Sequence, residues 1–76
     1  MTIQQLLTRA ETTYPPTQIV LKTICSRVGT ASEIADSLRL GSHGARTVRK
    51  WIGYPHTVPF SVWLALLAFD EATDEP

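Results

Sequence analysis

The residues best suited to chemistry in this chain are clustered polar side chains in one short segment: Arg46, Thr47, Arg49 and Lys50. Val48 and Trp51, which lie among them, recur at helical spacing, so residues 45–52 are predicted to form a helix with one apolar face. The polar side chains then share the opposite arc, which becomes cationic. Guanidinium and ammonium groups on an exposed helical face can bind phosphates and base edges. The pattern therefore favours a helix that enters the major groove of DNA.

The end of this helix and the loop after it complete the candidate site. Gly53 is the expected C-cap residue, because Pro55 cannot continue the helix. Tyr54 and His56 in the following loop are candidate contacts to the DNA backbone, together with Thr57. The alternative is an ordinary turn in which Tyr54 packs on the core.

The distribution of charge separates the cationic segment from the rest of the chain. Seven Lys and Arg residues balance seven Asp and Glu residues, so the formal net charge is zero. Between Ser37 and Phe69 there are four cations and no acidic residue, and acidic residues gather at the C-terminal end. Many surface cations are simply a solvated face, but the clustering of these four on and around one helix favours a polyanionic partner.

The length of the chain limits how it can be stabilised. Seventy-six residues form one domain with a small core, and the single cysteine, Cys25, allows no intrachain disulfide. One cysteine and two isolated histidines offer no set of metal ligands, so neither a metal nor a cofactor is expected. Self-association is the expected additional source of stability.

The ends of the chain carry no recognisable targeting segment. The N-terminus lacks a basic start followed by an apolar run, and the longest apolar stretch, residues 58–69, is too short to span a bilayer. The sequence therefore predicts a soluble, cytoplasmic protein without a membrane partner. We expect a single domain over residues 1–71 and an acidic, disordered tail over residues 72–76.

Capping and turn residues divide the chain into about five short helices, so the expected fold is all-α, a compact bundle. The first helix runs from Ile3 to about Glu11, and consecutive prolines end it. The second runs from Pro16 to Val28, and its expected inner face consists of Val20, Leu21, Ile24, Cys25 and Val28. Its β-branched residues also permit a strand, but no neighbouring segment offers a pairing strand, so helix is favoured.

The third helix begins with a capping-box pattern, Thr30-Ala31-Ser32-Glu33, and is expected to end at about Leu38. Gly41 and Gly44 then mark a turn before the cationic helix. The turn between these two helices is therefore placed around the glycines.

The last helix, from Phe60 to about Glu71, is apolar around nearly its whole circumference. Such a helix must be covered on nearly all sides, and in so small a chain one side needs a partner. We therefore predict a homodimer built on this helix. The expected interface residues are Trp63, Leu64, Leu67 and Phe69.

Several motifs occur together in the order Glu33-Ile34-Ala35, Leu38, Arg46-Thr47-Val48-Arg49-Lys50-Trp51, Pro59 and Leu66-Leu67. Over residues 30–69 this order resembles the helix-turn-helix of the lambda-repressor/Cro family. The resemblance implies that Ala35 lies where two helices cross closely, and that Val48 and Trp51 anchor a recognition helix. It also implies that the exposed early residues of that helix contact bases. The chain departs from the family pattern at Arg39, where a glycine is usual.

Two alignments with this family are open. In the first, Val48 and Trp51 match, the recognition helix covers residues 45–52, and the turn is about three residues longer than usual. In the second, no insertion is needed, the helix begins near Ser42, and Ser42 and His43 join the DNA contacts. A small shift of this kind nearly preserves the helical face, so both alignments stay open. The first is favoured because it matches Trp51 to the tryptophan of the family pattern.

These observations predict a sequence-specific repressor of the small phage or plasmid type. It would bind double-stranded DNA as a homodimer at an inverted-repeat operator and act by occupying that operator. The alternative is a protein-interaction module with the same fold, such as a phage-encoded inhibitor of host defence. An enzyme or a small-molecule substrate is not expected, because nothing orients Cys25 and His43 for nucleophilic catalysis and no phosphate-binding loop is present.

Overall fold

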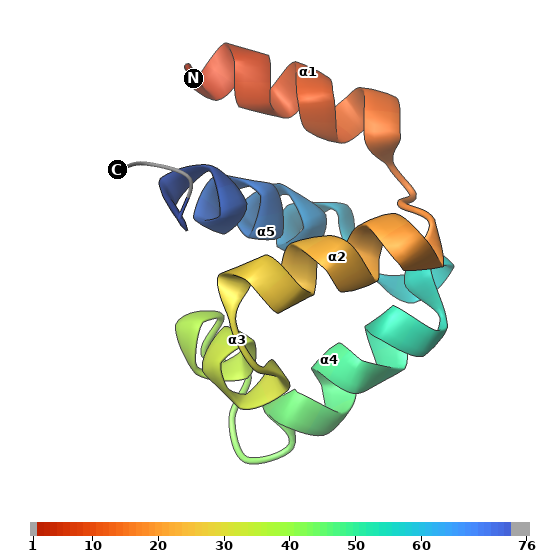
Figure 1. Cartoon of the computed structure of the whole chain (residues 1–76), viewed down its shortest axis with the longest axis vertical. Helices are drawn as coiled ribbons and strands as arrows, with labels where there is room; N and C mark the ends of the chain where they lie inside the picture. Colours follow the sequence, from red (N-terminus) through yellow and green to blue (C-terminus); the bar gives the residue numbers. More distant parts are fainter. Residues whose placement is uncertain (1, 74–76) are drawn as a thin grey trace.

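Five α-helices with short connections form residues 2–73, the part of the chain that this computed structural model describes (Figure 1). They are α1 (Ile3–Thr13), α2 (Gln18–Val28), α3 (Ala31–Ser37), α4 (Gly44–Gly53) and α5 (Phe60–Thr73), with a 3-10 turn, η1 (Pro55–Thr57), before α5. The described residues contain no strand, so the predicted all-α fold is confirmed and the strand alternative for the second helix is wrong. No helix within these residues is long and apolar enough to cross a membrane.

Reciprocal side-chain caps fix the starts of α1 and α3. The Thr2 hydroxyl accepts a hydrogen bond from the Gln5 N–H at 3.2 Å, and the Gln5 side chain accepts one from the Thr2 N–H at 2.9 Å. Thr30 and Glu33 form the same pair of bonds at 3.1 and 3.0 Å. Each arrangement satisfies two backbone donors that a helix start leaves free, so the capping box predicted at Thr30 is confirmed.

The second helix differs from the prediction at its start and in its inner face. Thr17 caps it by accepting a hydrogen bond from the Val20 N–H at 3.3 Å, so Pro16 precedes the helix instead of opening it. Val20, predicted to face inward, is 41% exposed, whereas Leu21 and Ile24 are buried. The prediction for Val20 was wrong because the buried face of α2 is centred on Leu21 and Ile24, and Val20 lies at the edge of that face.

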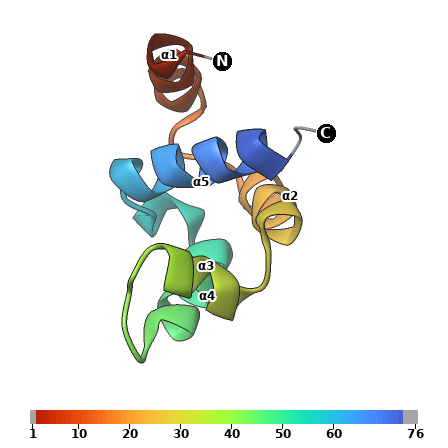
Figure 2. The same cartoon turned by 90° about the vertical axis from the view of Figure 1, so that its left-hand side faces the viewer.

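α5 is the central helix, with α1 packed on one side and α2 on another (Figures 1 and 2). Trp63 is fully buried and donates a hydrogen bond from its indole N–H to the Thr13 hydroxyl of α1 at 3.1 Å. Leu67 is also buried within the chain. The prediction that Trp63 and Leu67 belong to a dimer interface is therefore corrected, because both side chains are already buried inside a single chain, in which α1 and α2 pack on α5. Leu64 and Phe69 are only partly buried.

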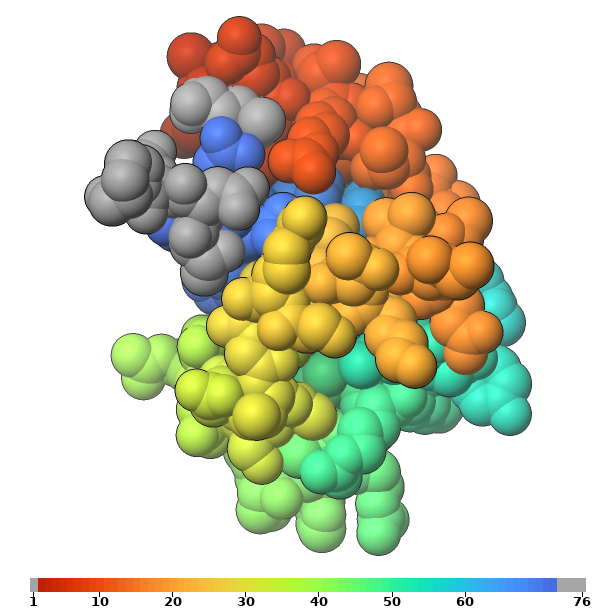
Figure 3. Space-filling view, in the orientation of Figure 1, coloured from red at the N-terminus to blue at the C-terminus, as the bar shows by residue number. Residues whose placement is uncertain are grey.

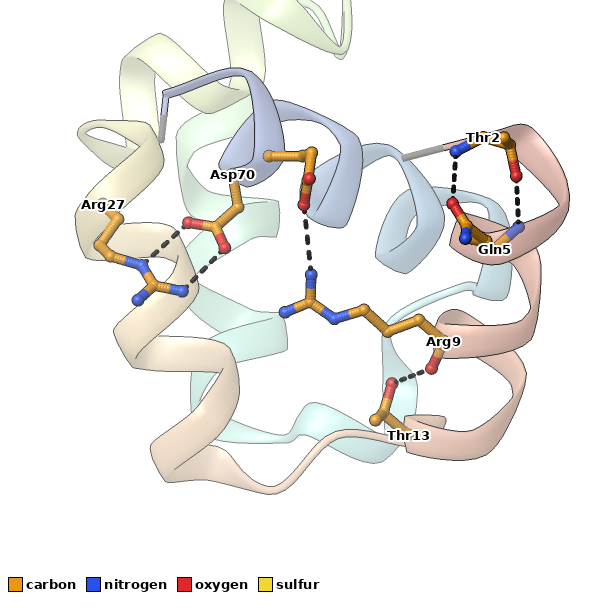
Figure 4. A network of polar contacts seen from close by, with 7 residues as sticks. Thr2, Gln5, Arg9, Thr13, Arg27 and Asp70 are labelled. Atoms are coloured by element: carbon orange, nitrogen blue, oxygen red, sulfur yellow. Dashed lines mark hydrogen bonds and ion pairs between the residues drawn. The ribbon is translucent and has the colours of Figure 1, made fainter. Parts of the chain in front are cut away.

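Acidic residues of α5 pair with arginines of α1 and α2 (Figure 4). Asp70 is 1% exposed and accepts hydrogen bonds from the guanidinium of Arg27, at 2.9 Å from Nε and 2.7 Å from Nη2. Glu71 forms a longer ion pair with Arg9, at 3.7 Å. These contacts hold α1 and α2 to the central helix, so Asp70 and Glu71 belong to the folded domain.

The C-terminal boundary also differs from the prediction. α5 continues through Thr73, so Ala72 is helical and is not the first residue of a disordered tail. Residues 74–76, the remainder of the predicted tail, lie outside the described residues.

Candidate nucleic-acid interface

α3 and α4 pack closely on each other and form the end of the molecule that lies away from α1 (Figures 1 and 2). Gly44, the first residue of α4, lies where the two segments approach closely. A Cβ atom there would lie 2.7 Å from the Cβ of Ala35 and 2.7 Å from the Cβ of Leu40, so only glycine fits without a backbone movement. The expectation that Ala35 lies at a close helix crossing is confirmed.

α4 presents one face to the core and the opposite face to solvent. Val48 is 1% exposed and Trp51 is 9% exposed, and both belong to the main hydrophobic core. Arg46, Arg49 and Lys50 are exposed, which confirms the helical phase predicted from the sequence. We call these three residues the basic face. In Figure 3 the green part of the chain, which includes the start of α4, projects at the lower end of the molecule.

The basic face has no acidic partner within residues 2–73. The ion pairs there are Arg27 with Asp70 and Arg9 with Glu71, and both lie on α1, α2 and α5. Two of the acidic residues that balance the total charge, Asp70 and Glu71, therefore pair with arginines on other helices. Although the formal net charge is zero, the exposed side of α4 is a surface of unpaired positive charge, which attracts polyanions.

The turn before α4 begins with a Schellman motif at the end of α3. The Arg39 N–H donates to the Asp36 carbonyl at 3.1 Å, and the Leu40 N–H donates to the Ala35 carbonyl at 3.0 Å. Arg39 has a φ of 56°, in the left-handed region that glycine adopts most readily. Sequence reasoning missed this residue, because turn composition drew attention to the glycines that follow it.

The start of α4 lies between the starts given by the two alignments, and closer to residue 45 than to Ser42. Ser42 and His43 are exposed and precede the helix. His43 occupies the N-cap position, and its carbonyl accepts hydrogen bonds from the N–H and the hydroxyl of Thr47, both at 3.2 Å. Thr47 itself is half-buried, so it presents less surface to a partner than the arginines beside it.

The end of α4 differs from the prediction. Gly53 is the last helical residue, and Tyr54 takes the C-cap position with a φ of −134°, so Gly53 is not the C-cap. Tyr54 is 60% exposed, and its ring meets that of His56 edge-on at 6.4 Å between centroids, so the alternative that Tyr54 packs on the core is wrong. Val58 anchors the loop, because it is buried and its carbonyl accepts a hydrogen bond from the Tyr14 hydroxyl at 2.6 Å.

Two groups with shifted pKa values lie outside α4, on α2 and α3. Cys25 is buried in the core, and this burial raises the pKa of its thiol to about 11, which keeps it protonated. Hydrogen bonds from Thr30 lower the pKa of Glu33, as expected for a carboxylate that caps a helix. In the part of the chain that the structure describes, no three His, Cys, Asp or Glu side chains lie together as metal ligands would.

Comparison with known proteins identifies a similar sequence of known role. No model of a protein family matches the chain, and no solved structure matches it. The chain is 33% identical, over 63 residues, to the transcriptional repressor protein KorC of Escherichia coli. The matched segment covers 82% of this chain and 74% of KorC, so the similarity extends over most of both proteins.

Proposed function

The chain belongs to the family of the transcriptional repressor KorC, and from this membership we propose that it is a cytoplasmic repressor that binds double-stranded DNA. In this proposal α4 enters the major groove at an operator, and occupancy of the operator blocks transcription. The observation that carries the proposal is the basic face of α4, which is exposed and has no acidic partner among residues 2–73.

The packing of α4 suits base recognition. Val48 and Trp51 anchor the helix in the core, and Gly44 brings its first turn against α3, so the basic face is held on a fixed support. Rigid placement matters because a bidentate contact to a base requires both donors in position at once.

Each side chain of the basic face has a role that its chemistry suggests. The guanidinium groups of Arg46 and Arg49 match the O6 and N7 acceptors of guanine, and the ammonium of Lys50 suits a phosphate. Further contacts come from the two ends of the helix: Ser42, His43, Thr47, Tyr54 and His56. Of these, all but Thr47 are exposed and can reach the phosphate backbone.

We also assign α3 and α4 to a helix-turn-helix of the lambda-repressor/Cro type. Two features support this assignment. The first is the close approach of Ala35 and Gly44, and the second is the left-handed residue Arg39 at the position where that family usually has glycine.

A homodimer on an inverted-repeat operator completes the proposal. Leu64 and Phe69 of α5 are only partly buried and can contribute apolar surface to a symmetric contact. Such a dimer would hold two copies of α4 about 34 Å apart, which is one turn of duplex. Light scattering should give a dimer, and a monomer at high micromolar concentration would contradict this part of the proposal.

Selection of bound fragments from a random pool of DNA duplexes tests the function directly. The expected result is enrichment of one inverted-repeat sequence, with affinity that falls steeply as salt rises. A protein that binds no duplex at low salt would contradict the proposal and would favour a protein-interaction module instead.

A further inference from the structure

Arg39 occupies a backbone position at which arginine is strained. It is the C′ residue of the Schellman motif that ends α3, and this motif requires a left-handed conformation. Glycine adopts this conformation without steric cost, whereas a residue with a Cβ atom does so only at an energetic penalty. The other two positions with positive φ in residues 2–73 are Gly29 and Gly41, so both of them have the residue that fits best.

The side chain of Arg39 offers the fold no visible compensation for this strain. It is exposed, and its guanidinium takes part in no side-chain hydrogen bond or ion pair within the described part of the chain. The bonds that complete the motif use the backbone N–H groups of Arg39 and Leu40, which glycine at position 39 would supply equally well. A reason for arginine at this position must therefore lie outside the folded chain.

The position of Arg39 indicates where that reason lies. The turn of residues 38–43, which contains Arg39, joins α3 to α4 at the end of the molecule that lies away from α1 (Figures 1 and 2). Arg39 therefore adds a fourth cation to the end that carries the basic face, within the stretch from Ser37 to Phe69 that has no acidic residue.

We infer that Arg39 binds a phosphate of the duplex whose groove α4 enters, and that this contact is why a strained arginine stands in the turn. The inference rests on the proposed function and extends the DNA contact from α4 to the turn that precedes it. A guanidinium suits this role because it presents several N–H donors in a plane to the phosphate oxygens.

Three substitutions separate charge from strain. Arg39→Gly removes both, Arg39→Gln removes the charge and keeps the Cβ atom, and Arg39→Lys keeps both. Each variant and the parent would be melted, and each would be titrated with a random-sequence DNA duplex over a series of salt concentrations. Arg39→Gly should raise the Tm by about 4–8 °C, because it removes about 1 kcal/mol of backbone strain at the left-handed position in the turn.

The binding data carry the decisive comparison. The slope of log affinity against log salt should become shallower by about one unit per bound subunit in Arg39→Gly and in Arg39→Gln, and should stay at the parent value in Arg39→Lys. If the parent shows a steep slope and the Gly and Gln variants reproduce it, the role of Arg39 is refuted while the proposed function stands. If the parent binds no duplex, both are refuted. A lower Tm for Arg39→Gly would overturn the argument from strain.

Discussion

Substitution of Gly44 by alanine should destabilise the protein, although alanine is the better helix former. The new Cβ would lie 2.7 Å from the Cβ atoms of Ala35 and Leu40. Both of these atoms are bonded directly to the backbone, so no side-chain rotation can relieve the contact and α3 and α4 must move apart. Overpacking costs about 1–3 kcal/mol, and two contacts at 2.7 Å to Cβ atoms place this substitution in the upper part of that range, at about 2–3 kcal/mol. The opposing gain in helix propensity is about 1 kcal/mol.

The net loss is about 1–2 kcal/mol, a large fraction of the stability of so small a domain. At about 4–8 °C for each kcal/mol, the Tm of Gly44→Ala should fall by about 4–16 °C. Thermal unfolding followed by circular dichroism measures this shift. Because α4 must move away from α3, binding to the operator should weaken as well.

Gly53→Ala is the matched control, because Gly53 is the last residue of the same helix and has no atom within 4 Å of its Cβ position. Here the gain in helix propensity is unopposed, so the Tm should rise. Opposite Tm shifts for two Gly→Ala changes on one helix would establish that packing around the new Cβ atom decides whether the Tm rises or falls. A Tm for Gly44→Ala at or above that of the parent would refute the close approach of α3 and α4.

Three further predictions concern the core and the caps. Trp51→Ala should abolish the cooperative thermal transition, because loss of a buried aromatic costs about 3–5 kcal/mol, and a normal melt would show that the ring is not buried. Arg27→Met should cost about 1.5–3 kcal/mol in chemical denaturation, because it removes two hydrogen bonds to the buried carboxylate of Asp70. The double variant Arg27→Met/Asp70→Leu should lose less free energy of unfolding than Arg27→Met alone, and a larger loss would contradict the account. The lowered pKa of Glu33 means that its carboxylate stabilises α3 above the ordinary pKa of 4.5 and that this contribution is lost as pH falls through the folded-state value. The Tm advantage of the parent over Glu33→Gln should therefore be present at neutral pH and vanish in acid, and an advantage that persists in acid would contradict this assignment.

Features that depend on residues within one or two helical turns could be predicted from the sequence. The cap at Thr30 and the phase of α4 are of this kind. Val48 and Trp51 repeat at the spacing of one helical turn, so their common face follows from helix geometry alone. The exposed basic face follows in turn, since its residues occupy the remaining arc.

Features that depend on how helices meet could not be predicted. α5 is apolar on nearly all sides because α1 and α2 both cover it, and the sequence does not distinguish such cover from a second subunit. The partner of Asp70 is Arg27, 43 positions earlier in the chain, so no local pattern connects them. Val20 faces outward for a similar reason, because the border of the buried arc on α2 depends on the helices packed against it.

Arg39 is the residue of the candidate interface that turn composition did not find. Its left-handed conformation is unusual for arginine, so residue type gives no local indication of it. The resemblance to the lambda-repressor/Cro family offered the one available indication, because that family usually has glycine where this chain has Arg39.

The central claim is that the basic face of α4 binds DNA, and one binding measurement tests it most directly. The triple variant Arg46→Ala/Arg49→Ala/Lys50→Ala should keep the fold, since all three side chains are exposed, and should bind the DNA selected by the parent far more weakly. Its salt slope should be shallower by about one unit for each phosphate contact removed. Lys22→Ala, which removes an exposed cation on α2, is the control and should bind as the parent does. A folded triple variant that binds the selected DNA with the affinity and salt dependence of the parent would contradict the account.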